Sequence, residues 1–166
     1  MNKKKYISLA KRSADIQINE LKKIKKTFNS SFVKAVDLIV NNKGKIIFAG
    51  IGKSGLIARK ISATFSSVGI PSFFCDPAQA LHGDMGQIDK KDLLIIFSYS
   101  GNTSELKNML RYANRYRIKI IGVASKPESI LLKASDVKIL IPKVKESDVT
   151  SMVPTSSTSI TLLPVS

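Results

Sequence analysis

Five short apolar runs, separated by segments of helical pattern, recur between residues 45 and 141. Short apolar strands that alternate with amphipathic helices are typical of βαβ units and of a parallel sheet covered on both faces. The pattern predicts an α/β fold, a three-layer αβα sandwich around a five-stranded parallel sheet. We assume the flavodoxin-like strand order 2-1-3-4-5 from this fold class, because the sequence itself does not determine it. The expected strands are 45–49, 71–75, 93–97, 118–124 and 137–141, and the expected helices between them are 56–68, 103–116 and 128–134.

The residues before this alternating region have a different pattern. Apolar residues from Ile18 to Phe28 recur every three or four positions with lysines between them, which predicts a helix. A serine after Asn29 can cap a second helix that ends before Gly44. We therefore divide the chain into N-terminal helices at 1–42, which pack on the domain or on another subunit, and a ligand-binding domain at 43–166. A last short helix is expected to start near Pro154.

The charge of the chain narrows the classes of partner. Its 166 residues include 27 basic and 12 acidic side chains, which give a net charge of +15 and suggest nucleic-acid binding. The lysines are widely spread, however, and no aromatic residues alternate with them in the manner of RNA-binding modules. We interpret them as a solvated surface that would also attract an anionic substrate, and we expect no specific nucleic acid as a partner.

The apolar runs, the single cysteine and the single histidine exclude further classes of protein and of site. The apolar runs are too short to span a bilayer, and the N-terminus lacks the apolar core of a signal peptide, so we expect a cytoplasmic protein with no membrane partner. Cys75 is the only cysteine and His82 the only histidine. An intrachain disulfide and a multi-histidine metal site are therefore excluded, and we interpret Cys75 as a packing residue.

Two loops between a strand and a helix carry the chemistry of a phosphate site. The first is Gly50-Ile51-Gly52-Lys53-Ser54-Gly55, in which glycines let backbone amides approach an anion and Lys53 adds a positive charge. The second follows Phe97, where Ser98, Ser100 and Thr103 supply hydroxyl donors and Gly101 permits a tight turn. If the strands before these loops are neighbours, both loops line one crevice.

The first loop alone permits other interpretations. It matches G-x-G-x-x-G, with Asp76 about twenty residues further on, as in dinucleotide-binding folds. The loop does not match the P-loop motif, because Ile47 occupies the position at which that motif requires its first glycine. The second loop favours a phosphomonoester, because many short hydroxyl donors must surround three oxygens, whereas a dinucleotide fold requires no such group after its third strand.

Six motifs in register make a family resemblance specific. Together they resemble the sugar isomerase (SIS) domain of the arabinose 5-phosphate isomerases, the KpsF/GutQ family, from about Lys43 to Leu163. The motifs are Gly52-Lys53-Ser54-Gly55, Pro71 to Phe74, His82 to Gly86, Ser98 to Glu105, Pro127-Glu128-Ser129 and Pro154 to Thr158.

The resemblance implies a reaction and its requirements. The family interconverts D-arabinose 5-phosphate and D-ribulose 5-phosphate through an enediol(ate), which supplies the Kdo sugar of lipopolysaccharide or capsule. This reaction needs a phosphate anchor, an oxyanion stabiliser and a base, but no metal and no organic cofactor. The family also implies a homo-oligomer, a tetramer.

Residue roles follow from the same resemblance. Lys53 would stabilise charge on the sugar oxygen and Glu146 would be the proton-shuttling base. Glu105 and His82 would assist, with His82 contacting the substrate of its own or a neighbouring subunit. For each of these residues the alternative to a catalytic role is a structural one, as a surface side chain or as a charge at a helix terminus. The residues expected to hold the substrate or its phosphate are Gly52, Ser54, Ser98, Ser100, Gly101, Thr103, Thr155 and Ser156.

The sequence also departs from the family. Full-length members continue with a longer helix, a Ser-His-Pro-Gly-Gly segment and paired CBS domains, none of which follows Thr158 here. We therefore expect a C-terminally truncated SIS domain that binds a pentose 5-phosphate. An isomerase is the leading hypothesis, a non-catalytic sugar-phosphate-binding module the second, and a dinucleotide-binding protein the third.

Overall fold

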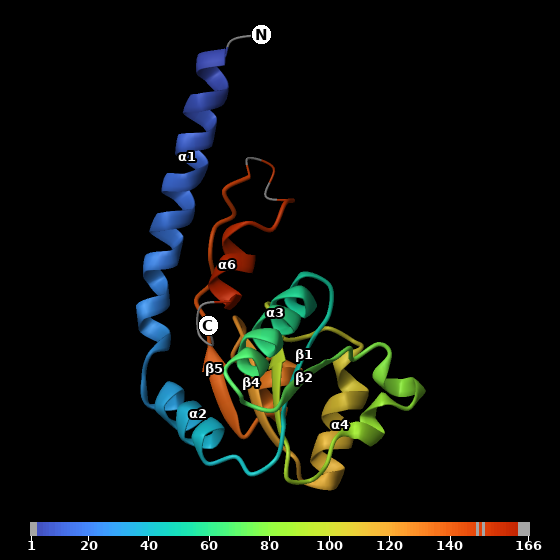
Figure 1. The fold of residues 1–166 in the computed structure, drawn as a ribbon. Helices are drawn as coiled ribbons and strands as arrows, with labels where there is room; N and C mark the ends of the chain where they lie inside the picture. The colour runs from blue at the N-terminus through green and yellow to red at the C-terminus, as the bar shows by residue number, and fades with distance from the viewer. Residues whose placement is uncertain (1–2, 149, 151, 163–166) are drawn as a thin grey trace.

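The sheet has the strand order that the fold class suggested. The structure is a computed structural model that describes residues 3–148, 150 and 152–162. Its five strands run parallel in the order β2-β1-β3-β4-β5, which confirms both the predicted α/β class and the order 2-1-3-4-5 (Figure 1). The strands are β1 (Ile46–Gly50), β2 (Ser72–Cys75), β3 (Leu93–Phe97), β4 (Lys119–Ala124) and β5 (Val137–Leu140).

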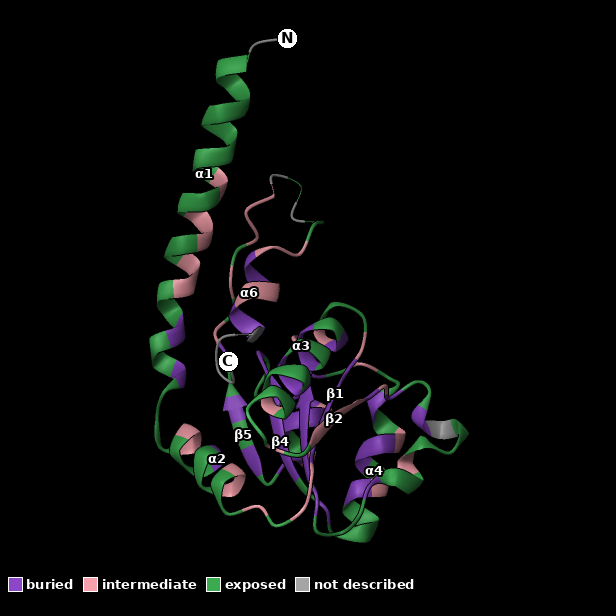
Figure 2. Ribbon diagram, in the orientation of Figure 1, coloured by how far each residue is buried: buried purple, intermediate pink, exposed green. Residues whose placement is uncertain are grey.

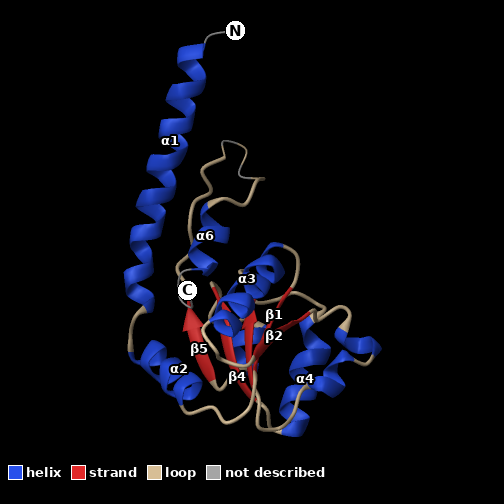
Figure 3. Cartoon of the chain, in the orientation of Figure 1, coloured by secondary structure: helices blue, strands red, loops and turns tan. Residues whose placement is uncertain are grey.

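Helices cover both faces of this sheet (Figure 3). Phe48, Ile95 and Val123 point to one face and pack with α2, α3 and α6, whereas Ile47, Leu94 and Ile120 point to the other and pack with α4 and α5. Successive side chains of a strand face opposite sides, so central strands covered on both faces must be apolar throughout. The helices are α1 (Lys3–Leu21), α2 (Ser30–Val40), α3 (Lys53–Ser67), α4 (Leu106–Tyr116), α5 (Ile130–Ala134) and α6 (Ser156–Leu162), with 3₁₀ helices η1 (Lys22–Thr27), η2 (Ala80–His82) and η3 (Asp84–Gln87).

The burial pattern separates this core from the N-terminal helix (Figure 2). Strands β1 and β3 are buried along their whole length. Helix α1, in contrast, has no buried residue, and its N-terminal half extends away from the sheet. Its apolar side chains Tyr6, Ile7 and Ile18 remain exposed. Among the residues of α1, only Leu21 at its end packs against the core, and it is only partly buried.

Three helices begin at positions that differ from the sequence prediction, and the smallest difference is at α5, which begins at Ile130 rather than at residue 128. Helix α3 begins at Lys53, three residues before the expected Leu56, because Gly52 turns the chain directly into it at a φ of 58°. Helix α4 begins at Leu106 rather than at Thr103. The Thr103 hydroxyl lies 3.0 Å from the Ser98 hydroxyl, so residues 101–105 form a turn before the helix.

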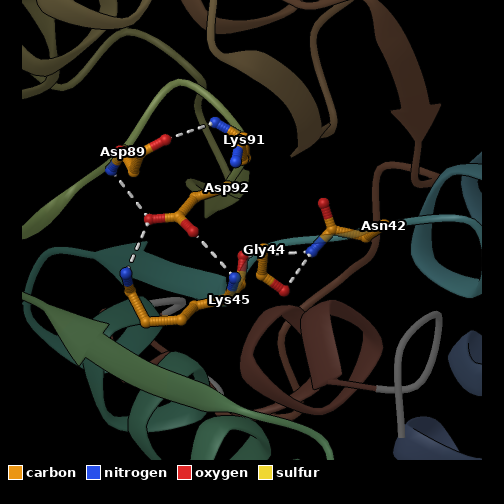
Figure 4. Close-up of polar contacts among 6 residues, drawn as sticks. All are labelled: Asn42, Gly44, Lys45, Asp89, Lys91 and Asp92. Carbon is orange, nitrogen blue, oxygen red and sulfur yellow. Dashed lines mark hydrogen bonds and ion pairs between the residues drawn. The ribbon is translucent and has the colours of Figure 1, made fainter.

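A buried carboxylate joins the amino ends of β1 and β3 (Figure 4). Asp92 is 3% exposed and accepts hydrogen bonds from the backbone N–H groups of Lys45 at 2.7 Å and Asp89 at 2.8 Å. Its carboxylate also lies 3.2 Å from the Lys45 ammonium group. Asp92 thus satisfies backbone donors that the sheet leaves unpaired at this edge. The opposite edge, at the carboxyl ends of the strands, carries the site described next.

Candidate functional site

The two phosphate-type loops meet in one cavity. Strands β1 and β3 are neighbours, and Gly50 pairs with Phe97 at their carboxyl ends. The loops that follow therefore leave the sheet side by side. Between them and α6 lies a cavity of about 330 Å³, which we call the loop cavity. The prediction that both loops line one crevice is confirmed. The polar residues that line it are Lys53, Ser54, Ser98, Tyr99, Ser100, Thr103, Ser157, Thr158 and Thr161.

Glycines let the first loop fold tightly over the end of β1. A Cβ atom on Gly55 would lie 2.6 Å from the carbonyl oxygen of Gly50, and one on Gly50 would lie 2.9 Å from the backbone of Ser54. Only glycine permits this approach of helix and strand. As a result, Lys53 and Ser54 occupy the first turn of α3, and both line the loop cavity. The helix dipole places partial positive charge at this terminus, which favours an anion.

Hydroxyl groups shape the second loop from within. Ser98 is buried, its hydroxyl accepts from the Gly101 N–H at 3.1 Å, and it lies within hydrogen-bond distance of Thr103. The Ser100 hydroxyl accepts from the Asn102 N–H at 3.3 Å. Gly101 has a φ of 67°, and a Cβ there would overlap the Ser129 side chain. Gly101 therefore shapes the turn while the hydroxyls of Ser98, Ser100 and Thr103 line the cavity.

Helix α6 supplies a third wall of the loop cavity, through residues next to those expected from the sequence. We expected Thr155 and Ser156 to hold substrate, but neither lines the loop cavity. Their neighbours Ser157 and Thr158 do, together with Thr161. The spacing of residues 157, 158 and 161 places them on one face of a helix, but it does not determine which face of α6 turns toward the loops. Ser156 is fully buried, and its hydroxyl has no hydrogen-bond partner among the described residues.

Glu146 lies outside the loop cavity, at the N-terminus of α6. Its carboxylate accepts from the Thr155 N–H at 2.7 Å, the Thr155 hydroxyl at 3.0 Å and the Ser157 N–H at 3.3 Å. Partial burial raises the pKa of this carboxyl, but hydrogen bonds from Ser157 and Thr155 outweigh burial and lower the pKa overall. Glu146 instead lines a second cavity of about 430 Å³, the α1 cavity, together with Leu9, Arg12 and Ile16 of α1.

The other two acid–base candidates also lie away from the loop cavity. Glu105 is exposed, and a hydrogen bond from the Ser104 hydroxyl at 2.7 Å lowers the pKa of its carboxyl. His82 is exposed in η2, after β2. Neither side chain lines the cavity, and neither does Gly52, whose role is to turn the chain into α3. The structure thus brings together Lys53, Ser54, Ser98, Ser100 and Thr103, but not Glu105, Glu146 or His82.

The surroundings of Cys75 and Asp76 indicate a structural role for each of them. Burial, with the charges of Asp84 and Asp76, raises the pKa of Cys75 to about 11, which fits a packing residue rather than a nucleophile. The Asp76 carboxylate accepts from the Ala78 N–H at 2.9 Å and so stabilises the turn after β2.

Among the described residues, no three His, Cys, Asp or Glu side chains group as a metal site. The helices of that same part of the chain include none long and apolar enough to cross a membrane.

Comparison with known proteins identifies the family. The family model described as SIS domain matches residues 38–166. The chain belongs to the SIS domain family. This confirms the resemblance noted in the sequence, and it places the loop cavity in a SIS fold.

Relatives of this SIS domain carry names of isomerases. It is 38% identical over 158 residues to arabinose 5-phosphate isomerase KdsD of Pseudomonas aeruginosa, covering 95% of this chain and 48% of the relative. It is 40% identical to the protein of that name from Francisella tularensis, covering 95% of this chain and 49% of the relative. The chain thus spans about half the length of the curated relatives it matches.

Solved structures agree with the fold in detail. A protein from Escherichia coli CFT073, solved in complex with arabinose 5-phosphate, superposes on this SIS domain with a TM-score of 0.92 at 32% identity. The match covers 98% of this chain and 87% of the other. This agreement extends the likeness from sequence motifs to the whole arrangement of strands and helices.

Proposed function

We propose that the loop cavity binds the phosphate of a pentose 5-phosphate, and that the protein is an arabinose 5-phosphate isomerase. One observation carries the proposal. Two loops distant in sequence bring the Lys53 ammonium group and the hydroxyls of Ser54, Ser98, Ser100 and Thr103 to one cavity of about 330 Å³. That volume suits a small ligand, and this set of donors suits a dianion. The names of the relatives and the bound sugar phosphate of a structural neighbour support the choice of ligand.

In the proposed reaction the phosphate is bound by the loop hydroxyls and by the N-terminus of α3. The sugar carbons then lie toward α6, whose Ser157 and Thr158 can hydrogen-bond sugar hydroxyls. Lys53 stabilises the negative charge that develops on the sugar oxygen as the enediolate forms. The reaction has no net change in oxidation state, because C1 is reduced as C2 is oxidised: one proton moves from C2 to C1, and a second moves from the C2 oxygen to the C1 oxygen.

The proton transfer is assigned to Glu146, with Glu105 and His82 in assisting roles. The resemblance to the family supports Glu146, and so does its position beside the wall of the cavity. Pro154 and Ser157 line the loop cavity, whereas Thr155 between them lines the α1 cavity with Glu146. Residues 154–157, at the start of α6, therefore lie between the Glu146 carboxylate and the proposed substrate.

One observation favours a second function, a sugar-phosphate-binding module without catalysis. None of Glu105, Glu146 and His82 lines the loop cavity, although general acid–base catalysis requires a group within hydrogen-bond reach of the transferred proton. Such a module would bind the sugar phosphate through the same hydroxyls and release it unchanged.

The two functions differ in a direct assay. Arabinose 5-phosphate is incubated with the chain, ribulose 5-phosphate is measured, and binding is followed in parallel by calorimetry. An isomerase forms the ketose, and Lys53→Met lowers its rate. Binding without product would support the module. A chain that binds a nicotinamide dinucleotide but no sugar phosphate would overturn both and restore the third hypothesis.

The wider setting forms part of the same proposal. We place the protein in the cytoplasm, because a dianionic substrate does not cross a bilayer unaided. We assign its product to Kdo supply for lipopolysaccharide or capsule on the family resemblance. The exposed apolar side chains of α1 support a homo-oligomer, a tetramer by the same resemblance.

A further inference from the structure

Tyr99 lies between two hydroxyl residues of the second loop but binds a different part of the chain. Its phenol oxygen accepts a hydrogen bond from the Val144 N–H at 2.9 Å, 45 positions further along the chain. Its backbone carbonyl accepts from the N–H of Ser125 at 2.9 Å and from the Ser125 hydroxyl at 2.7 Å. The ring packs against the core on the α3 side of the sheet and also lines the loop cavity. Tyr99 is therefore fixed at both its backbone and its side chain.

The segment that Tyr99 holds has no regular structure of its own. In the described part of 142–155 there is neither helix nor strand. Such a segment is ordered by individual hydrogen bonds, since it lacks the repeating bonds of a helix or sheet. Tyr99 supplies one of these bonds, at Val144, and the Glu20 carboxylate supplies another by accepting from the Lys145 N–H at 2.9 Å.

Beyond Val144 the same segment is hydrogen-bonded to the start of α6. Glu146 accepts three hydrogen bonds from Thr155 and Ser157 at the start of this helix. The Ser147 N–H donates to the Thr155 hydroxyl at 2.9 Å. A continuous set of contacts thus runs from the second loop through Tyr99 and Val144 to Glu146, and on to the wall formed by α6.

We propose that Tyr99 is a positioning residue that fixes Glu146 and α6 relative to a phosphate bound in the second loop. The inference rests on the proposed function only for the identity of the ligand. A phosphate held by Ser98 and Ser100 immobilises the backbone on both sides of Tyr99. The phenol then transmits this order to the 143–148 segment, because its acceptor oxygen is the contact between the two.

The variant Tyr99→Phe tests this with little change in packing, because it keeps the ring and removes only the acceptor. Hydrogen exchange of the whole chain is measured with and without arabinose 5-phosphate. In the free protein the amide of Val144 should exchange about five- to tenfold faster, the amount expected for one hydrogen bond. In the wild type the sugar phosphate should slow exchange in both 98–103 and 143–148. In the variant it should protect only 98–103.

Kinetics give a second measurement that a general loss of stability would not produce. We expect Tyr99→Phe to lower kcat by about tenfold while KM changes by less than about threefold, since Ser98 and Ser100 remain in place. The control is Tyr112→Phe, which removes a phenol hydroxyl from α4 on the other face of the sheet. It should leave exchange at Val144 and the kinetic constants unchanged.

Exchange results separate this inference from the proposed function. If the wild type forms no ribulose 5-phosphate, the isomerase proposal fails, but exchange with arabinose 5-phosphate or inorganic phosphate still tests the role of Tyr99. Loss of ligand protection at 143–148 in the variant would support it. Equal protection in wild type and variant, or protection of 143–148 by neither ligand in the wild type, would overturn it.

Discussion

Ser100 and Ser104 belong to the same turn, but only Ser100 lines the loop cavity. The Ser104 hydroxyl donates to Glu105 instead. We predict that Ser100→Ala weakens arabinose 5-phosphate binding by about 1–3 kcal/mol, the usual loss for a hydrogen bond to a charged group. Ser104→Ala, the matched control, should leave the affinity unchanged. Calorimetric titration measures both, and equal affinities for the two variants would count against the second loop as the phosphate site.

Glu146 gives a prediction with a defined pH dependence. Its pKa is lowered in the folded protein, so its stabilising effect is present above the unfolded-state pKa and is lost as the pH falls through the folded value. Glu146→Gln should lower the free energy of unfolding by about 1 kcal/mol at pH 7, as other losses of a helix cap do. The difference should shrink as the pH falls from the unfolded-state pKa through the lower folded-state pKa, because the wild-type carboxyl becomes protonated over that range. Urea unfolding at a series of acidic pH values and at pH 7 tests this, and a constant difference would contradict it.

For individual residues, the sequence predicted which hydroxyl side chains line the loop cavity better than it predicted where the acidic side chains lie. Ser98, Ser100 and Thr103 could be assigned because they directly follow a buried strand, and a parallel sheet brings such residues to one edge. The position of Glu146 could not be predicted. It depends on the path of the chain just after β5, where Tyr99 and Glu20, both distant in sequence, accept hydrogen bonds from the backbone of Val144 and Lys145.

Among the elements, the strands were predictable because they are buried on both faces and therefore uniformly apolar. The start of α4 was not, because the Thr103 hydroxyl lies against Ser98 within the turn rather than at the helix terminus. Helix α6 was expected, but its orientation was not. Pattern alone could not distinguish the face that carries Ser157 and Thr158 from the one that carries Thr155.

Asp92 and Asp136 each directly precede a strand, and each accepts a backbone N–H group near the start of the neighbouring strand. Substituting both tests how burial changes the contribution of such a carboxylate to stability. Asp92 is buried and accepts backbone N–H groups at the start of β3, whereas Asp136 is exposed and accepts the Ile120 N–H at 2.9 Å. We predict that Asp92→Ala lowers the free energy of unfolding by about 2–4 kcal/mol, because buried donors lose their partner. Asp136→Ala should cost less than about 1 kcal/mol, since water can replace it. Chemical denaturation measures both, and equal losses would refute the role of burial.

For the whole molecule, the question is what covers α1. Its apolar residues Tyr6, Ile7, Leu9 and Ile18 are exposed, and only two basic residues, Lys11 and Arg12, lie between Tyr6 and Ile18. We predict that the chain self-associates through this helix, and that Ile7→Lys combined with Ile18→Lys shifts the sedimentation coefficient toward the monomer. Val68→Lys, which changes an exposed apolar residue just after α3, is the control and should have no effect. A wild type that sediments as a monomer would contradict this prediction.

Asp92 and the loop cavity occupy opposite edges of one rigid sheet, and this arrangement has a practical consequence. The stability that Asp92 supplies can therefore be changed without altering a residue that lines the cavity. Substitutions of Ser157 or Thr158 are the ones expected to change ligand preference, whereas α6 also contributes to stability through its hydrogen bonds to Glu146.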